Sequence, residues 1–255
     1  MTGHSQRKPP EAAWFTATVV GARRIAPAVM SVEIRVETES PFAYCEGQYI
    51  RIQLADGRRR DLSIANAHDR ENLLEMWVRD VGGDFSRHVF DRLVTGEQWD
   101  FEGPLGDAWV RDDDRPLLLV TGGTGLGPAR AIVRAELARD PSRTIDLVHG
   151  DERREDLFAH EELEHWSREH PSFGYRPTLR VPDAEWEGAT GTPDQLIDQQ
   201  QWDVHDRVAH LFGPPPMVEA AIQVLRKQGI DASDIHADAF TPGATDLDYR
   251  YPPGR

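Results

Sequence analysis

The first half of the chain contains short runs in which apolar and polar side chains alternate. The clearest run is 30–36, where Met30, Val32, Ile34 and Val36 are separated by polar residues. An alternation with a period of two is typical of a strand that has one buried face. Further β-rich runs occupy 14–20, 47–54, 73–78 and 97–103. Several short strands with turn signals between them predict a barrel or a sandwich.

One helix is expected among these strands. In 84–96, Phe85, Val89 and Leu93 are spaced as on one face of a helix, and Gly96 follows its expected end. The charged segment 111–116 has no periodic pattern and ends in proline, which is typical of a linker between domains.

The pattern changes after this linker. Strands are expected at 117–123, 144–150, 173–180 and 207–213, and helices at 128–140, 155–170 and 216–229. The last helix has an apolar stripe that includes Val218, Ala221 and Leu225. Alternating strands and helices predict a parallel sheet that is covered by helices on both faces.

Composition excludes several classes of function. The formal net charge of -15 would repel nucleic acid and anionic membranes, so neither is expected as a partner. Cys45 is the only cysteine, which excludes an intramolecular disulfide and a plant-type iron–sulfur cluster within this chain. Apolar runs such as 117–120 are too short to span a bilayer, and the start of the chain lacks the apolar core of a signal peptide. A cytoplasmic location is therefore expected.

The histidines offer no metal site. In "HEELEH", His160 and His165 are five residues apart and diverge by about 140° on an α-helix, whereas zinc proteases need histidines four apart. No metal is expected.

A glycine-rich turn follows the strand expected at 117–123. Its glycines are Gly122, Gly123, Gly125 and Gly127, and Pro128 stands at the expected first position of the next helix. Such a turn lets backbone N–H groups approach a phosphate, and the helix terminus adds about half a positive charge. The spacing matches neither the common dinucleotide fingerprint nor a P-loop, so a tight connection without a ligand is the alternative.

A second turn of this kind follows the strand expected at 207–213. Gly213 allows a close turn, and Pro214, Pro215 and Pro216 rigidify the entry to a helix. Because the carboxyl ends of parallel strands meet at one edge of a sheet, both turns are expected to face one crevice. A helix start stiffened by proline is the alternative, but it does not explain why both turns occur together.

Five motifs together resemble a known family. The segments "RDLSIA", "VGGDFS", "EGPLG", "TGGTGLGP" and "FGPPPM" occur in the order seen in the ferredoxin-NADP reductase superfamily. The resemblance runs from about Phe15 to Phe240 and is strongest to the flavin reductase and oxygenase-reductase branches, without an iron–sulfur domain. It implies a flavin-binding antiparallel barrel at 12–110 and a Rossmann-like nicotinamide-binding α/β domain at 115–240. Residues 1–11 and 241–255 would be tails.

The resemblance implies a flavin site around the arginine-rich segment 58–65. Arg60 would bind a flavin phosphate, and Ser63 would place its hydroxyl near the hydride-accepting N5 atom as a catalytic residue. Ile64 and Ala65 would offer backbone contacts. Leu62 replaces the usual aromatic residue, so a stacking contact is lost and the flavin is either prosthetic or a substrate. Arg58 and Arg59 are expected in a solvated turn.

The segment "GGDFS" resembles the pyrophosphate loop of the family. Gly82, Gly83 and Ser86 would hold a pyrophosphate at a helix start, which favours FAD and leaves FMN as the alternative. The other interpretation is a helix that is simply capped by Asp84 or Ser86.

The resemblance also implies a site for NADH or NADPH, the hydride donors. Its residues would be Gly122, Gly123, Thr124, Gly125, Gly127, Pro128, Phe212, Gly213, Pro214, Pro215 and Met217. Phe212 stands where the family often has cysteine, and its ring would either shield the site or occupy the nicotinamide position.

Two carboxylates bear on this coenzyme site. Asp238 and Phe240 resemble the family's acid-x-phenylalanine element, so Asp238 is a catalytic candidate beside the nicotinamide; a surface carboxylate is the alternative. Glu152 stands where many relatives have arginine, which would suit ribose hydroxyls and favours NADH. Arg153 and Arg154 follow it and could support NADPH.

Two functions are consistent with these features. One is an enzyme that passes hydride from NAD(P)H to FAD and electrons onward to an oxygenase component, a ferredoxin or free flavin. The other is a non-catalytic flavin- or nucleotide-binding module or electron-relay subunit.

Overall fold

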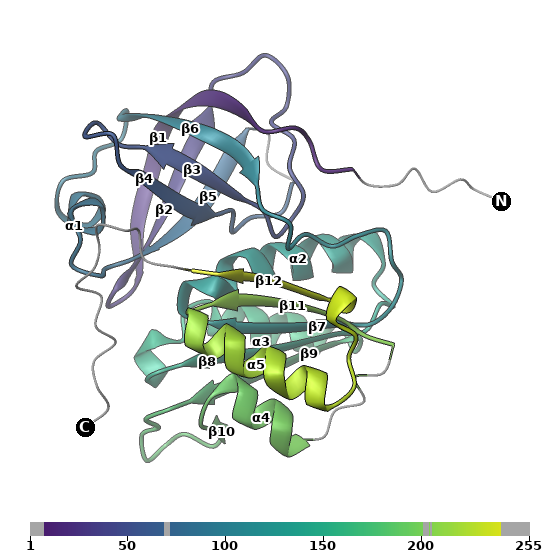
Figure 1. The fold of residues 1–255 in the computed structure, drawn as a ribbon. Helices are drawn as coiled ribbons and strands as arrows, with labels where there is room; N and C mark the ends of the chain where they lie inside the picture. The colour runs from purple at the N-terminus through teal and green to yellow at the C-terminus, as the bar shows by residue number, and fades with distance from the viewer. Residues whose placement is uncertain (1–7, 69–71, 201–203, 205, 241–255) are drawn as a thin grey trace.

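The computed structural model describes residues 8–68, 72–200, 204 and 206–240. Two six-stranded sheets follow one another along the chain, one antiparallel and one parallel (Figure 1). The first takes its strands from residues 13–105 and the second from residues 117–239. The change of architecture therefore falls within 106–116, where the charged linker is expected. Of the two predicted tails, 241–255 lies wholly outside the described residues, and so do residues 1–7 of the tail 1–11.

The antiparallel sheet closes into a barrel. Its strands are β1 (Ala13–Ala26), β2 (Val29–Val36), β3 (Tyr49–Gln53), β4 (Arg59–Ser63), β5 (Leu73–Arg79) and β6 (Gln98–Leu105). Their order is β4-β3-β6-β1-β2-β5. Just beyond β4, a bridge joins Ile64 to Met76 of β5, and the Ala65 N–H donates to the Glu75 carbonyl at 2.7 Å. These contacts join the two edge strands, so the expected barrel is confirmed.

Strand β4 was not expected from the apolar pattern. Arg59, which was expected in a solvated turn, pairs with Gln53 at the start of β4. Only Leu62 of this strand packs against the barrel core. Arg59, Arg60 and Ser63 line a cavity instead, so this strand carries polar residues where an ordinary barrel strand carries apolar ones.

Helix α1 (Asp84–Asp91) covers one end of the barrel. Phe85 and Val89 pack into the barrel core, as their spacing predicts. The helix ends earlier than expected, because the N–H groups of Arg92 and Leu93 both bond to the carbonyl of His88 and turn the chain away. Gly96, with φ 95°, belongs to the turn before β6.

The second sheet is entirely parallel. Its strands are β7 (Leu117–Gly122), β8 (Ile145–Asp151), β9 (Phe173–Leu179), β10 (Ala189–Thr190), β11 (Val208–Gly213) and β12 (Ile235–Ala239), in the order β10-β9-β8-β7-β11-β12. Its helices are α2 (Leu126–Arg139), α3 (His160–Glu169), α4 (Pro193–Gln200) and α5 (Pro215–Lys227). Strands β10 and β12 and helix α4 were not expected from the apolar pattern.

Both faces of this sheet are covered by helices (Figure 1). Leu117 and Leu119 of β7 share a core with residues of α2 and α3. Leu118 and Val120 share a different core with residues of α4 and α5. All four side chains are fully buried, which explains why β7 reads as a continuous apolar run. The predicted α/β architecture is confirmed.

Pro128 differs from its expected position. The glycine-rich turn forms one turn of 3-10 helix (Gly123–Gly125), and α2 begins directly afterwards at Leu126. Pro128 is therefore the third residue of α2, a place where its missing N–H still costs no helical hydrogen bond. Among the described residues, no helix combines the length and apolar content needed to cross a membrane.

Candidate functional site

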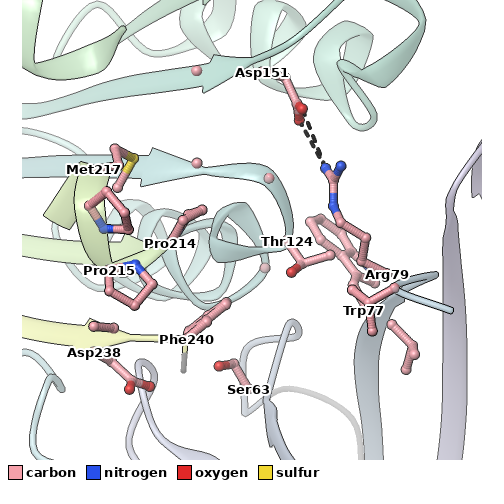
Figure 2. A pocket seen from close by; sticks show the side chains of 18 of the residues that line it. Ser63, Trp77, Arg79, Thr124, Asp151, Pro214, Pro215, Met217, Asp238 and Phe240 are labelled. Atoms are coloured by element: carbon pink, nitrogen blue, oxygen red, sulfur yellow. Dashed lines mark hydrogen bonds and ion pairs between the residues drawn. The ribbon is translucent and has the colours of Figure 1, made fainter. Parts of the chain in front are cut away.

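A large cavity lies between the barrel and the parallel sheet. Its volume is about 2340 Å³, more than twice the usual upper size of about 1000 Å³ for a small-ligand pocket. The barrel contributes β3, β4, β5 and the start of α1, and the parallel-sheet domain contributes the carboxyl ends of β7, β8 and β12 and the turn that follows β11. Figure 2 shows Ser63, Asp238 and Phe240 near one another, on one side of the space that Thr124 and Pro215 also border. The cavity is therefore large enough for two dinucleotides.

The arginine-rich segment divides between the cavity and the surface. Arg60 lines the cavity, and its Nη1 donates to the carbonyl of Arg59 at 2.9 Å. Arg58 does not line the cavity, because its guanidinium forms ion pairs with Asp56 and, at 2.9 Å, with Asp84. Arg58 and Arg60 are only two residues apart, but only Arg60 lines the cavity.

The N-terminus of α1 also opens on the cavity. Gly83 is the N-cap residue and supplies no side-chain hydrogen bond to the helix. Neither Asp84 nor Ser86 caps the helix as the simpler interpretation expected: Asp84 pairs with Arg58, and the Ser86 hydroxyl lies 3.2 Å from Asp80 and 3.0 Å from the Gly83 carbonyl. The partial positive charge of this helix end therefore faces the cavity without a side-chain cap.

The glycine-rich turn forms the opposite wall. Gly122, Gly123, Thr124 and Gly127 line the cavity. Gly123 has φ +55°, and a side chain there would begin 3.0 Å from the guanidinium of Arg79. Gly125 has a different role, because a Cβ on it would overlap the backbone carbonyl of Phe212. Glycine is therefore favoured at 123 by its left-handed backbone conformation and at 125 by the close approach of the Phe212 backbone.

The proline-rich turn stands beside it, with Pro214, Pro215 and Met217 on the cavity wall (Figure 2). Both turns border the same cavity, and a Cβ on Gly122 would lie 2.7 Å from the sulfur of Met217, so the turns are also in contact. The ring of Phe212 was expected either to shield the coenzyme site or to occupy the nicotinamide position. Instead, it is fully buried in the core and does not line the cavity.

Asp238 and Phe240 complete this end of the cavity. Asp238 lies on β12 opposite Phe212 of β11, and the N–H of Phe240 donates to the carbonyl of Gly213 at 2.8 Å. Burial, with a smaller contribution from Asp61, raises the pKa of Asp238 to about 6. This carboxyl can therefore change its protonation state near neutral pH, unlike an ordinary surface carboxylate.

An ion pair between the two sheets crosses the cavity and was missed from the sequence. Arg79, at the end of β5, lies 3.3 Å from Asp151, at the end of β8 (Figure 2). Burial raises the pKa of Asp151 to about 6, although the charge of Arg79 opposes the shift. In the sequence, each of the two residues directly follows an expected strand. This does not indicate that their side chains meet.

Glu152 lies on the cavity wall beyond Asp151. Its carboxylate is 3.0 Å from Arg180, and both side chains are more than 40% exposed. Arg153 also lines the cavity, whereas Arg154 does not and pairs with Glu185 at 3.5 Å. Arg180 was missed from the sequence.

The structure brings together most of the predicted site residues. Those that line the cavity are Arg60, Leu62, Ser63, Gly83, Ser86, Gly122, Gly123, Thr124, Gly127, Pro214, Pro215, Met217, Asp238 and Phe240. Those that do not are Ile64, Ala65, Gly82, Gly125, Pro128, Phe212 and Gly213. Within the described ranges, no group of three or more His, Cys, Asp or Glu residues is placed to hold a metal ion.

Two family models match the chain, one for each sheet. The oxidoreductase FAD-binding domain matches residues 16–109, and the oxidoreductase NAD-binding domain matches residues 119–223. The division between them falls where the architecture changes.

Curated relatives match most of the chain. It is 34% identical over 238 residues to the reductase subunit of an aromatic O-demethylase from an Amycolatopsis species, covering 90% of this chain and 70% of the relative. It is 32% identical over 232 residues to the ferredoxin–NAD(P)+ reductase component of the naphthalene 1,2-dioxygenase system of Pseudomonas putida, covering 87% and 70%. Both relatives are therefore longer than the matched region.

Solved structures share the fold. A cytochrome P450 reductase from Amycolatopsis superposes with a TM-score of 0.85 at 33% identity, covering 92% of this chain and 72% of that one. The ferredoxin reductase of a carbazole 1,9a-dioxygenase superposes with a TM-score of 0.81 at 27% identity, covering 90% and 70%.

The raised pKa of Asp238 predicts a pH-dependent stability difference. With a pKa of about 6 in the folded protein against 3.8 for the free side chain, the folded state binds more protons between these pH values. The free energy of unfolding therefore falls as pH rises through this window. Asp238→Asn removes the cost of burying an ionised carboxylate. The free energy of unfolding of this variant should therefore exceed that of the wild type by about 1 to 3 kcal/mol near pH 8. At about pH 4 the two proteins should be nearly equal. Urea unfolding at both pH values measures this, and an equal difference at both would contradict the assignment.

Proposed function

This chain belongs to the ferredoxin-NADP reductase superfamily of FAD- and NAD-binding oxidoreductases, and we propose that it is the reductase that supplies electrons from NAD(P)H to a separate oxygenase component. The observation that carries the proposal is the cavity bordered by both sheets. It brings the polar strand β4 and the glycine-rich turn to opposite walls of one space. A donor and an acceptor ring can meet only if their sites share such a space.

The barrel side fits a flavin nucleotide with two phosphates. Arg60 offers a guanidinium that can bind one phosphate in a bidentate manner, and the α1 N-terminus offers uncapped N–H groups to another. These two positive groups lie on one cavity wall and come from different elements. Two anion sites on this side support FAD rather than FMN.

The parallel-sheet side fits the nicotinamide coenzyme. Gly122 and Gly123 line the cavity at the turn before α2, where backbone N–H groups and the helix start can bind a phosphate. Arg79 lies beside this turn, where it is paired with Asp151. Glu152 at the far wall supports NADH, because a carboxylate suits ribose hydroxyls and repels a 2′-phosphate. Arg153 and Arg180 stand on the same wall and reduce that preference.

When bound, the flavin would accept hydride from the coenzyme and release electrons to a second protein. The residues around it would bind, orient and shield. We assign Ser63 the hydroxyl contact to the flavin ring and Asp238 a carboxyl beside the nicotinamide, because both border the same part of the cavity. Phe240 would cover this part from the end of β12.

An oxygenase as acceptor is supported by the names of the relatives, two of which serve an O-demethylase and a naphthalene dioxygenase system. The experiments below distinguish an oxygenase from a ferredoxin or free flavin as the acceptor. They also distinguish the enzyme from a non-catalytic electron-relay subunit. We also propose a cytoplasmic location, supported by the single cysteine, since the chain cannot form an internal disulfide.

Stopped-flow reduction tests the proposal. Anaerobic mixing of the FAD-loaded protein with NADH should bleach the visible absorbance of the oxidised flavin, and NADPH should do so more slowly. Reoxidation is then followed with an oxygenase component, with a ferredoxin and with free flavin, and the oxygenase should be fastest. If neither NADH nor NADPH bleaches the flavin, only the non-catalytic role would remain.

Arg60→Ala should weaken FAD binding by about 1.5 to 3 kcal/mol, the scale of a hydrogen bond to a charged group. Arg35→Ala is the matched control, because Arg35 is exposed on β2 and does not line the cavity. Fluorescence titration of the flavin-free protein with FAD measures both affinities. Equal affinities for the two variants would remove Arg60 from the flavin site.

Ser63→Ala should slow bleaching by about a hundredfold, the lower end of the range for loss of one well-placed catalytic group. The affinity for FAD should change little, since Ser63 carries no charge. The limiting rate constant at saturating NADH is the measurement. A rate constant equal to that of the wild type would assign Ser63 to the cavity wall only.

A further inference from the structure

One side chain of the parallel-sheet domain reaches across to the flavin strand, the name used here for β4 and its continuation to Ala65. Arg130, on α2, donates from Nη1 to the carbonyl of Ala65 at 3.0 Å and lies 3.2 Å from the carboxylate of Glu75. Ala65 is two residues beyond Ser63, and Glu75 belongs to β5. This arginine is therefore bonded to both sides of the junction that closes the barrel.

The guanidinium is held on its own side as well. Its Nε and Nη2 donate to the two oxygens of Glu162 on α3, at 2.6 and 2.9 Å. It also lies over the ring of Trp77, with 5.5 Å between the guanidinium carbon and the ring centroid. The side chain is only 13% exposed, so these contacts are largely removed from water. A bidentate, buried guanidinium has little freedom to move.

Glu75 is prepared to receive this charge. Its carboxylate accepts from the hydroxyl of Ser31 at 2.7 Å and from the indole N–H of Trp77 at 2.9 Å. Burial by itself would raise the pKa of Glu75, but these hydrogen bonds and the charge of Arg130 outweigh it and hold the pKa below its ordinary value. The barrel thus presents a fixed, ionised carboxylate to the neighbouring domain.

The same helix carries the phosphate turn. Gly127 stands three residues before Arg130, and a Cβ on it would lie 3.1 Å from Ala65 and 3.3 Å from Trp77. The first turn of α2 therefore rests directly on the flavin strand, and the glycine-rich turn precedes it without an intervening loop. A shift of α2 along the barrel would move the coenzyme phosphates relative to Ser63.

We propose that Arg130 is a positioning residue, which fixes the start of α2 against the Ser63–Ala65 segment and thereby sets the distance between the two ring sites. This inference rests on the proposed function. Arg130 does not line the cavity and acts through the elements it joins. Because misplacement by about 1 Å can cost about a hundredfold in rate, a small loosening here should be visible in the transfer step.

The test compares Arg130→Gln with Arg139→Gln. Arg139 is on the same helix, but its contacts are Glu136 and Asp114, which are outside the barrel strands. In stopped-flow reduction by NADH, Arg130→Gln should lower the limiting rate constant about tenfold or more, with FAD content and the dissociation constant for NADH within about twofold of the wild type. Arg139→Gln should match the wild type. Arg130→Lys keeps the charge but not the fork, and should recover part of the lost rate.

A second readout needs no flavin chemistry. Amide hydrogen exchange of the segments 60–67 and 122–130 should accelerate in Arg130→Gln and not in Arg139→Gln. Should Arg130→Gln fail to fold, Arg130→Lys serves in both measurements, with a smaller loss expected.

These outcomes separate the two proposals. If the wild type is bleached by neither NADH nor NADPH, the proposed function fails, whereas exchange still reports on Arg130. If the wild type is bleached, a limiting rate constant and an exchange pattern unchanged in Arg130→Gln overturn the positioning role. A change confined to the dissociation constant for NADH overturns it as well, because Arg130 would then affect coenzyme binding rather than ring placement.

Discussion

The contact between the first turn of α2 and the end of the flavin strand is the constraint on which the site depends. Gly127 rests on Ala65 and Trp77, and Arg130 bonds to the carbonyl of Ala65 and to Glu75. Without this close approach, the barrel and the parallel sheet would each present half of a binding surface to solvent. With it, both halves border one cavity.

The charges are arranged around this contact in an acidic protein. Although the formal net charge is -15, several arginines lie at the cavity and at the domain junction. Arg60 lies on the barrel side of the cavity, and Arg79 is paired with Asp151 beside the glycine-rich turn. Arg130, on the helix that follows this turn, is paired with Glu75 and Glu162. Positive charge at the cavity favours phosphate-bearing cofactors, while the surrounding acidic chain disfavours nucleic acid and other polyanions. The arginines at 58–60 are thus one part of a wider distribution.

The sequence was sufficient for the architecture and for most of the cavity wall. Period-two runs and glycine- or proline-marked strand ends are local signals, and they predicted the barrel strands around 30–36 as well as the turns at Gly122 and Pro214. Strand β4 was missed because one of its faces lines the cavity and carries arginines where an apolar pattern was sought. The position of Phe212 was misjudged, since the sequence shows only that an aromatic residue replaces a cysteine and not which way the ring points. Arg79 with Asp151, and Arg130 with Ala65, are separated by 72 and 65 residues, and no local pattern indicates such pairs.

The central claim is that one cavity holds both cofactors, with their rings adjoining near Ser63. A crystal structure of the protein with FAD and oxidised coenzyme tests it most directly. We expect the FAD phosphates at Arg60 and the start of α1, the coenzyme phosphates at the turn Gly122–Gly125, and the two rings in contact. FAD bound at the glycine-rich turn, or two rings in separate cavities, would contradict the claim.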